Sequence, residues 1–315
     1  MAQPLISICI PAYKKPQYVV RCLESIMQQS YKHVEVIISD DSPDEDIKLA
    51  IEPFINKLKI RYVPNEPALK SPKNWNAALD KSSGELMLLL HQDDWFHHPE
   101  ALLLFVAEFE KNPEVDFVFC QNTAVDETGK KYILQARPQL LTQLSQKPNH
   151  LLLAQVIGPP SNTMLRRTVR TRYDENFIWL VDVDYYSRIL KEGYHYSYLP
   201  MHLITIGLHD DQTTVFCRTN DSIILKENIL FANKLEMEAF QDILIYDYYW
   251  RLLRNYKVKS PEDLLKAGLS KGDIPTVIMH MINSQKNLSD SLLKKGIFSK
   301  GFMAINYLSW RRNSK

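Results

Sequence analysis

The sequence predicts an α/β fold, in which a mostly parallel sheet is flanked by helices and a helical extension follows at the C-terminus. Two observations support this prediction. Over residues 5–120, short apolar runs alternate with segments of helical periodicity, which is the pattern of repeated strand and helix units. Beyond residue 215, apolar residues recur mainly at helical spacing. We therefore expect one domain over residues 1–214 and a helical region over residues 215–315.

The first half of the chain supplies the expected sheet. Residues 5–10 are apolar apart from Ser7, which is typical of a buried strand. Pro16 follows at a position that the first turn of a helix accepts, and apolar residues then recur at helical spacing. Further strands are expected at residues 34–38, 60–63, 85–90 and 115–120, and further helices at residues 47–54, 74–81 and 99–111. Units of this kind pack as parallel strands with helices on both faces.

The pattern is mixed from residue 151 onward. A Gly-Pro-Pro turn at residues 158–160 precedes an apolar segment at residues 162–165. A helix is expected at residues 182–191, where polar and apolar residues again alternate with helical spacing. These segments continue the first domain, and we see no internal repeat in the sequence.

Composition excludes several classes of protein. The chain of 315 residues is 45% hydrophobic and 24% charged, as in globular proteins. Its 38 basic and 37 acidic residues nearly cancel, so we expect no nucleic-acid partner. Four dispersed cysteines without C-x-x-C spacing indicate reduced thiols and a cytoplasmic setting. We expect no signal peptide, because no basic segment precedes the short apolar stretch at residues 5–10. We also expect no membrane-spanning helix, because apolar runs of about 18 residues are missing.

Acidic pairs follow two of the expected strands, as Asp40-Asp41 and as Asp93-Asp94. Ligands of open parallel sheets bind at the carboxyl ends of the strands, so these acids should converge at one edge. Acids this close repel one another unless a cation lies between them, and oxygen ligands suit Mg²⁺ or Mn²⁺. The alternative for Asp40-Asp41-Ser42 is a turn or a helix cap. For residues 91–94, which lie in an exposed connection, we favour function.

As an ordered set, these motifs resemble the family 2 glycosyltransferases, whose fold is called GT-A. The resemblance covers about the first two-thirds of the chain. The segments that carry it are residues 8–13, Asp40-Asp41-Ser42, Asn74-Trp75-Asn76, Gly84-Glu85, His91-Gln92-Asp93-Asp94, residues 158–162, Asp182-Val183-Asp184 and His209. It implies a nucleotide-binding part at about residues 1–120 and an acceptor and catalytic part at about residues 121–214.

The resemblance also implies roles for single residues. The nucleotide pocket would be lined by Pro11, Ala12 and Tyr13. Asp41, with Asp40 beside it, would contact the base of a uridine or thymidine nucleotide. Asp93 and Asp94 match the acids that bind the metal and the ribose in this family. His91 stands in place of the first acid of a D-x-D run, so which of Asp93 and Asp94 binds the metal and which the ribose stays open. Candidates near the diphosphate are Lys73 and Asn74, together with Lys70, although a solvated surface is equally consistent with the lysines.

Two further positions complete the implied site. Asp182 is the candidate general base, with Asp184 as a rival, because the family places an acid six residues before an arginine such as Arg188. The alternative is that both acids merely favour the start of a helix electrostatically. His209 matches a histidine that closes over the metal and the diphosphate, and neutral imidazole is a competent ligand.

Taken together, the resemblance implies metal-dependent, inverting transfer of a sugar from a UDP or dTDP donor to a hydroxyl acceptor, with Mn²⁺ or Mg²⁺ as cofactor. The acceptor would be a glycan or a lipid-linked glycan of a surface polysaccharide. A sugar nucleotidyltransferase is the nearest alternative, but residues 11–13 replace the Gly-rich phosphate loop that such enzymes carry. A catalytically inactive binder of nucleotide sugars stays open.

The C-terminal tail is basic, with six cations and no acids after Asp290. Apolar residues, including Tyr307 and Trp310, are interleaved with the cations. One reading is peripheral contact with the inner face of a membrane, with the aromatic rings at the headgroup level. The other is a helix packed on the rest of the protein with solvated lysines, and the interruptions at Gly296 and Gly301 favour it.

Overall fold

A computed structural model describes residues 3–133 and 138–313. The chain forms two compact units, which we call the sheet unit and the helical unit. The sheet unit comprises residues 1–148, 155–175 and 181–210. The helical unit comprises residues 149–154, 176–180 and 211–315. Within the described residues, no helix has the length and apolar character needed to cross a membrane.

Four parallel strands form the first half of the sheet. They are β1 (Ile6–Ala12), β2 (Val34–Asp40), β3 (Ile60–Pro64) and β4 (Leu86–Leu89), in the order β3-β2-β1-β4. Ile8 of β1 lies beside Val36 on one side and Leu88 on the other, and all three are fully buried. Strands buried on both faces need continuous apolar runs, which is why β1, β2 and β4 are recognisable in the sequence.

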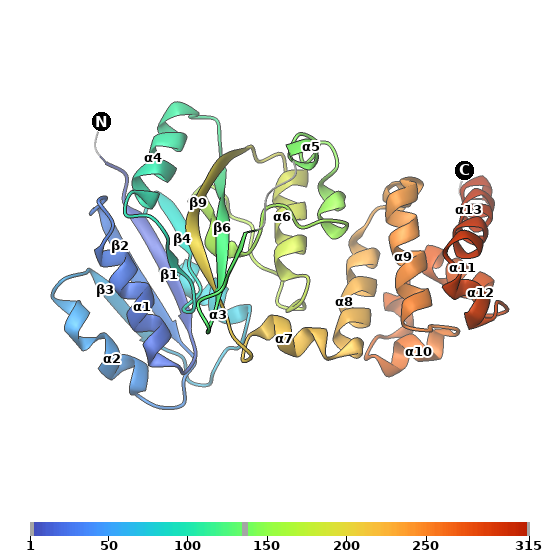
Figure 1. Ribbon diagram of the computed structural model, residues 1–315, viewed down its shortest axis with the longest axis horizontal. Helices are drawn as coiled ribbons and strands as arrows, with labels where there is room; N and C mark the ends of the chain where they lie inside the picture. The colour runs from blue at the N-terminus through green and yellow to red at the C-terminus, as the bar shows by residue number, and fades with distance from the viewer. Residues whose placement is uncertain (1–2, 134–137, 314–315) are drawn as a thin grey trace. The chain divides into compact units, whose positions relative to one another are not determined.

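Helices cover both faces of these strands (Figure 1). Ile6, Ile8 and Ile10 of β1 share an apolar core with the buried sides of α1 (Pro16–Met27), α2 (Asp46–Ile55) and α4 (Ala101–Lys111). The alternate residues of β1 point to the other face, where α3 (Lys73–Asp80) packs against β1 and β2. The expected helices are therefore all present, with ends that differ by one or two residues.

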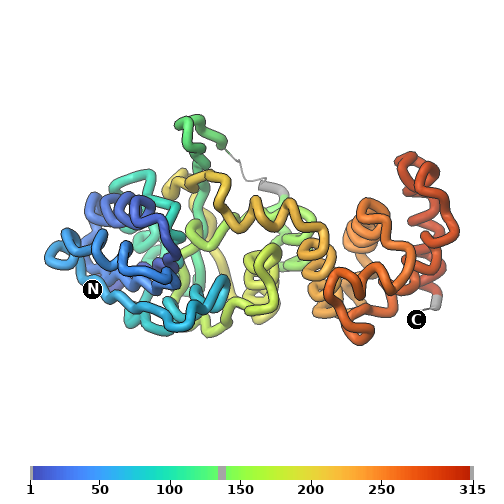
Figure 2. Tube along the Cα trace, turned by 90° about the horizontal axis from the view of Figure 1, so that it is seen from below, coloured from blue at the N-terminus to red at the C-terminus, as the bar shows by residue number. Residues whose placement is uncertain are grey.

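Beyond β4 the sheet is mixed rather than parallel. β8 (Thr163–Arg166) runs antiparallel between β4 and β6 (Phe117–Asp126), and β9 (Tyr196–Leu208) runs parallel to β6. β5 (Trp95–Phe96) adds to β9, and β7 (Lys131–Ile133) pairs with β6 in a hairpin that projects from the sheet (Figure 2). The α/β class is confirmed, but this antiparallel insertion does not follow from the alternation of strand and helix patterns.

The helical unit is built around aromatic side chains. Trp250, Tyr246, Tyr249 and Phe240 are among the largest fully buried residues of the described chain. Its helices are α7 (Thr213–Arg218), α8 (Asp221–Lys234), α9 (Ile243–Asn255), α10 (Pro261–Lys266), α11 (Thr276–Gln285), α12 (Asp290–Lys294) and α13 (Gly296–Asn313). The sheet unit also holds α6 (Val181–Lys191) and the short α5 (Pro138–Leu141).

Candidate active site

The loop after β1 is tied to the ends of two neighbouring strands. The Gln92 side chain accepts a hydrogen bond from Tyr13 N at 2.9 Å and donates one to Tyr13 O at 3.0 Å. Lys14 N donates to Ser42 Oγ at 2.7 Å. Lys14 and Lys15 have φ values of 53° and 55°, in the left-handed region, so the chain turns sharply here. This turn leaves the Tyr13 ring 52% exposed while Pro11 and Ala12 are buried.

Asp40 and Asp41 are both buried at the end of β2. Asp40 accepts hydrogen bonds from Ser42 N and from the Tyr62 hydroxyl, each at 2.8 Å. Asp41 accepts three hydrogen bonds, from Leu69 N, Lys70 N and the Asn65 side chain, at 2.7 to 3.0 Å. A carboxylate offers about four acceptor positions. Asp41 therefore orders the loop after β3 and retains about one further position for a donor.

Asn74 links the ends of β1 and β2 at the start of α3. Its side-chain nitrogen donates to Ser39 O at 3.0 Å and to Ala12 O at 3.3 Å, and the residue is 4% exposed. This amide is therefore occupied by the strand ends, so its contribution to a diphosphate would be indirect. The preceding Lys73 is exposed.

Three side chains beyond the end of β4 can hold a cation together. His91, Asp93 and Asp94 offer ligand atoms that all lie within 4.8 Å of one another. Asp94 is 2% exposed and accepts hydrogen bonds from the Ser161 hydroxyl at 2.5 Å and from Gly207 N at 3.2 Å. The same Ser161 hydroxyl accepts from His91 N at 3.0 Å. Ser161 therefore joins the loop after β4 to the start of β8.

His209 reaches this cluster through Asp93. The imidazole Nε2 of His209 lies 3.0 Å from Asp93 Oδ2, and its ring centroid lies 4.9 Å from that of Tyr18. The Asp93 backbone is fixed as well, because its carbonyl accepts from the Arg21 guanidinium at 2.8 Å. At Gly207, a Cβ atom would lie 2.4 Å from the same carbonyl, so only glycine allows β9 to approach this closely.

The electrostatics of the cluster fit a divalent cation. Burial and the charge of Asp93 raise the pKa of Asp94 well above its usual range, so a cation bound beside Asp94 would favour its charged form. Burial also lowers the pKa of His91, which keeps the imidazole neutral and able to coordinate. His91 Nε2 and His209 Nδ1 are buried and have no hydrogen-bond partner within residues 3–133 and 138–313. These are observations that a bound cation would explain.

A row of aromatic rings connects the cluster to α6. The Trp75 ring lies 4.7 Å from the His91 ring and 5.3 Å from that of Tyr173. Tyr173 in turn stacks on Tyr185 of α6 at 4.1 Å. The same helix carries Asp182 in its first turn. Trp75 is therefore used in packing within the sheet unit, which positions the start of α6 relative to His91.

Asp182 and Asp184 differ in their surroundings. Asp184 is 1% exposed and forms an ion pair with Arg188 at 2.8 Å. Asp182 is only half-buried, and its carboxylate accepts a hydrogen bond from Val183 N at 2.8 Å. Burial raises the pKa of Asp182 to about 6. Of the two acids, Asp182 is the one whose properties suit proton transfer near neutral pH.

A comparison with known families decides which group of proteins this architecture represents. The family model described as "Glycosyl transferase family 2" matches residues 7–173, which is 167 of the 315 residues. This match covers β1 from its second residue, all of β2 to β4 and the whole His91 to Asp94 segment. The chain is a family 2 glycosyltransferase. The resemblance of the sequence to this family and its assignment as a glycosyltransferase enzyme are thereby confirmed.

Individual relatives of this chain agree with its assignment to the glycosyltransferases. An uncharacterised glycosyltransferase of Haemophilus influenzae is 24% identical over 97% of this chain and 98% of its own length. A chondroitin synthase of Escherichia coli is 34% identical, but the match spans only 40% of this chain and 18% of that protein. The structure of S. aureus TarS 1-349 with UDP-GlcNAc superposes with a TM-score of 0.60 at 19% identity, over 98% of this chain and 92% of TarS 1-349. This likeness confirms the GT-A fold.

Several residues of the glycosyltransferase site are not evident from its sequence. Three hydrogen bonds hold the site together: Gln92 binds the Tyr13 loop, Ser161 binds Asp94, and Arg21 binds the backbone of Asp93. The two residues of each bond lie 67 to 79 positions apart in the chain. Gln92 and Ser161 lie inside segments that resemble family motifs, which is the only signal that marks them. His91 departs from the expected acid, and the structure nevertheless brings it into the cluster. The sequence therefore marks Gln92, Ser161 and His91 only as members of motifs, gives no signal for Arg21, and identifies the partner of none of them.

Proposed function

We propose that this glycosyltransferase transfers a sugar from UDP or dTDP to a hydroxyl acceptor with inversion, and that it requires Mn²⁺ or Mg²⁺. The observation that carries the proposal is the cluster of His91, Asp93 and Asp94, which lies beyond β4 and is bridged by Gln92 to the Tyr13 loop. A carboxylate cluster beside the carboxyl ends of β1 and β2 is where a nucleotide diphosphate and its cation belong in this kind of sheet.

The nucleotide base would lie at the ends of β1 and β2. Asp41 only accepts hydrogen bonds, and three of its acceptor positions are occupied by residues of the described chain. A base that binds there must therefore present an N–H donor, as uracil and thymine do at N3. Tyr13, which is 52% exposed, can pack against the base or the ribose. Asp40 supports Asp41 through its bonds to Ser42 and Tyr62.

Asp93 and Asp94 would hold the cation, with His91 or His209 as an imidazole ligand. When bound, the cation would neutralise charge on the departing nucleoside diphosphate. Ser161 and Gly207 N orient Asp94, and His209 orients Asp93. Such supporting hydrogen bonds fix the geometry of a metal ligand before the metal binds.

Asp182 would accept the proton of the acceptor hydroxyl. A base with a pKa of about 6 is ionised at neutral pH and is still a competent proton acceptor. Direct attack by the hydroxyl opposite the leaving group inverts the configuration at the anomeric carbon. Asp184, which is already paired with Arg188, would instead hold the first turn of α6. The chondroitin synthase among the relatives described above supports a glycan as the acceptor.

The proposal is tested by incubating the purified protein with a panel of nucleotide sugars, with Mn²⁺, with Mg²⁺ or with EDTA. We expect release of nucleoside diphosphate from a UDP or dTDP sugar in the presence of metal, and loss of this activity with EDTA. Turnover that persists in EDTA would contradict the metal dependence. Formation of a nucleotide sugar from a nucleoside triphosphate and a sugar phosphate would instead indicate a nucleotidyltransferase.

A further inference from the structure

One face of α13 holds this helix in the helical unit. Ser299, Met303, Asn306, Tyr307 and Trp310 are all buried, at spacings that place them on one side of a helix. Two buried hydrogen bonds fix this side, from the Tyr246 hydroxyl to Asn306 Oδ1 at 2.6 Å and from Trp250 Nε1 to Ser299 Oγ at 3.2 Å. The aromatic residues of the tail that the sequence suggested for a membrane interface, Tyr307 and Trp310, therefore belong to the core.

The opposite face of α13 is also apolar, and it is exposed. Ile297, Ile305 and Leu308 are 88%, 68% and 63% exposed, and Phe298 is 54% exposed. At about 100° per residue, these four side chains fall within about one-third of the helix circumference, away from the buried side. Packing of the helical unit does not explain them. A row of exposed apolar side chains on one helix face is typical of an interaction surface.

The charged residues of α13 and of the segment just before it are of one sign. Residues 291–315 contain no acid, and the exposed cations of the described part are Lys294, Lys295, Lys300, Arg311 and Arg312. The sixth, Lys315, lies outside the described residues. Lys300 and Arg311 border the apolar row along the helix, while Lys294 and Lys295 precede its first turn. Any partner of this surface must therefore accept apolar groups and carry negative charge.

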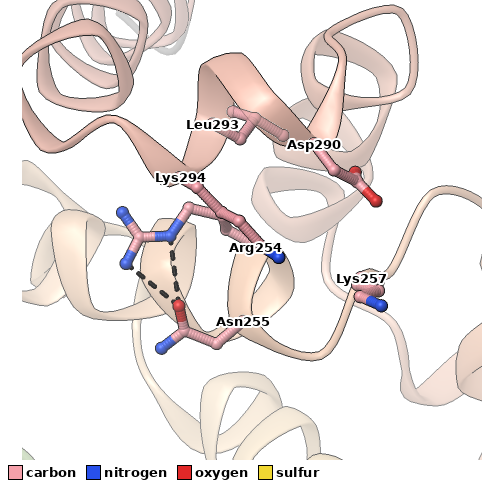
Figure 3. Close-up of a pocket in the computed structure, with 6 residues that line it drawn as sticks. All are labelled: Arg254, Asn255, Lys257, Asp290, Leu293 and Lys294. Atoms are coloured by element: carbon pink, nitrogen blue, oxygen red, sulfur yellow. Dashed lines mark hydrogen bonds between the residues drawn. The ribbon is translucent and has the colours of Figure 1, made fainter.

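A basic hollow adjoins the start of α13 (Figure 3). Its lining includes Arg254, Lys257 and Lys294, and its volume is about 220 Å³. The guanidinium of Arg254 donates to Ser299 Oγ at 3.2 Å, which joins the hollow to the first turn of α13. The acid at its edge, Asp290, forms an ion pair with Lys259 at 3.0 Å, which offsets its charge. The hollow thus places further cations next to the start of α13, on the side of Ser299.

We propose that this face of α13 binds the surface of an anionic lipid bilayer. We define the α13 surface by its apolar residues Ile297, Phe298, Ile305 and Leu308 and its cations Lys294, Lys295, Lys300, Arg311 and Arg312. The apolar side chains would enter the boundary between headgroups and acyl chains, and the cations would meet lipid phosphates. A second copy of the chain fits less well, because two α13 surfaces would bring cations together without any acid to offset them.

The test is co-sedimentation of the full chain with phosphatidylcholine vesicles that contain or lack phosphatidylglycerol, at low and high salt. We expect binding to the anionic vesicles at low salt. The double variant Ile305→Glu/Leu308→Glu should weaken it by at least about tenfold, because two exposed apolar groups no longer enter the bilayer. Lys294→Gln/Lys295→Gln should weaken it by about fivefold per charge. Leu49→Glu on α2, which replaces a residue that is 57% exposed, should bind like the unchanged protein.

Circular dichroism would verify that each variant keeps its helices, as expected for substitutions at exposed positions. Light scattering would report the oligomeric state in parallel. The proposal is overturned if the unchanged protein stays in the supernatant at low salt, or if Ile305→Glu/Leu308→Glu binds vesicles as well as Leu49→Glu. It is equally overturned if that double variant only converts a dimer to a monomer, since a second copy would then cover this face.

Discussion

Asp93 and Asp94 are adjacent in the chain, yet their surroundings set them apart. Burial by itself would raise the pKa of Asp93, but the hydrogen bond with His209 and the charges of His209 and His91 together outweigh it and lower this pKa. Asp94 faces the Ser161 hydroxyl and Gly207 N, which offset only part of the effect of burial and of the charge of Asp93, so its pKa is raised. Burial and hydrogen bonding thus favour the charged form of Asp93, whereas the charged form of Asp94 would gain from a bound cation.

This difference leads to a prediction for the two amide variants. Asp93→Asn and Asp94→Asn should each lower kcat/KM by at least about 100-fold, because loss of a metal ligand should cost no less than loss of a group that supports one. Both variants should need more Mn²⁺ for half-maximal activity. Metal titrations of donor turnover would measure this, with Asp44→Asn, at an exposed position on the loop before α2, as the matched control. Wild-type metal dependence in either variant would contradict the proposed metal site.

Asp182 leads to a prediction about pH. Its pKa of about 6 is raised by burial, and a general base acts only when ionised, so kcat/KM should fall as the pH drops below about 6 and level off above it. Asp182→Asn should keep donor affinity, lose about 10² to 10⁴ in kcat and lose this dependence on pH. Measurements of kcat/KM from pH 5 to pH 8 for both proteins would show whether the pH dependence is lost in the variant.

Asp184→Asn is the control for this prediction, because it changes an acid of the same turn that is paired with Arg188. It should reduce stability more than kcat, since it removes the buried carboxylate charge that pairs with the partly exposed Arg188 guanidinium. A larger loss of kcat in Asp184→Asn than in Asp182→Asn would move the base to Asp184. An unchanged pH profile in Asp182→Asn would remove the helix-start acid from the mechanism.

At the scale of elements, three parallel strands are joined by one carboxylate. Glu35 of β2 accepts hydrogen bonds from the Ser7 hydroxyl of β1 at 2.7 Å and from Ser83 N, just before β4, at 2.6 Å. Next to Ser83, Gly84 approaches β1 so closely that a Cβ atom would lie 2.7 Å from Ser7 Oγ. This junction lies at the ends of the strands opposite the site, and so it fixes the register on which the site depends.

Glu35 should therefore contribute to stability in a way that depends on pH. Burial would raise its pKa, but the bonds from Ser7 and Ser83 outweigh this effect and lower it to about 2. A depressed carboxyl pKa stabilises the folded state above the ordinary value of 4.5, and this contribution is lost as the pH falls towards about 2. Glu35→Gln should reduce the free energy of unfolding at pH 7 by about 1–2 kcal/mol.

Urea unfolding at several pH values would measure this contribution. The difference between the unchanged protein and Glu35→Gln should narrow from pH 4.5 downward. Glu45→Gln is a suitable control, because Glu45 is exposed and paired only with Lys48 among the described residues. A difference that stays constant with pH would show that the Glu35 charge contributes nothing.

Local pattern predicts some elements well and others poorly. The strands β1, β2 and β4 are short, mainly apolar runs buried on both faces, and the helices α1 and α4 each have one apolar side. The local sequence pattern therefore predicts which residues of these elements are buried. β9 and β8 depend on partners far along the chain. β9 lies beside β6 with a register shift near Gln121, and β8 inserts antiparallel beside β4. Pairing over such distances leaves no periodicity to recognise.

The same limit applies to the candidate site. Adjacent acids at strand ends predict a cluster at one edge, and His91, Asp93 and Asp94 do converge there. The partners of these acids come from elsewhere, because Ser161 and Gly207 reach Asp94 from 67 and 113 positions away. Residue type alone also does not separate Asp182 from Asp184. Their difference arises from exposure and from Arg188, which only the packed structure defines.

At the scale of the whole molecule, the two units have separate cores. Trp310 of α13 is 5% exposed and lies 5.6 Å from the Tyr246 ring and 6.3 Å from the Phe240 ring, all within the helical unit. Trp310→Ala should reduce the stability of this unit by about 3–5 kcal/mol, because it removes a large buried ring. Leu308→Ala, at a position that is 63% exposed, should change it by less than about 0.5 kcal/mol.

Amide hydrogen exchange would locate the loss. In Trp310→Ala, the amides of α9 and α11 should exchange faster by a factor that matches the lost stability, because both helices contact α13. The amides of β1 and β2 belong to the core of the sheet unit and should keep their rates if each unit opens independently. Donor hydrolysis should persist in this variant at temperatures where the sheet unit stays folded. Equal acceleration throughout the chain would mean that the two units unfold as one cooperative body.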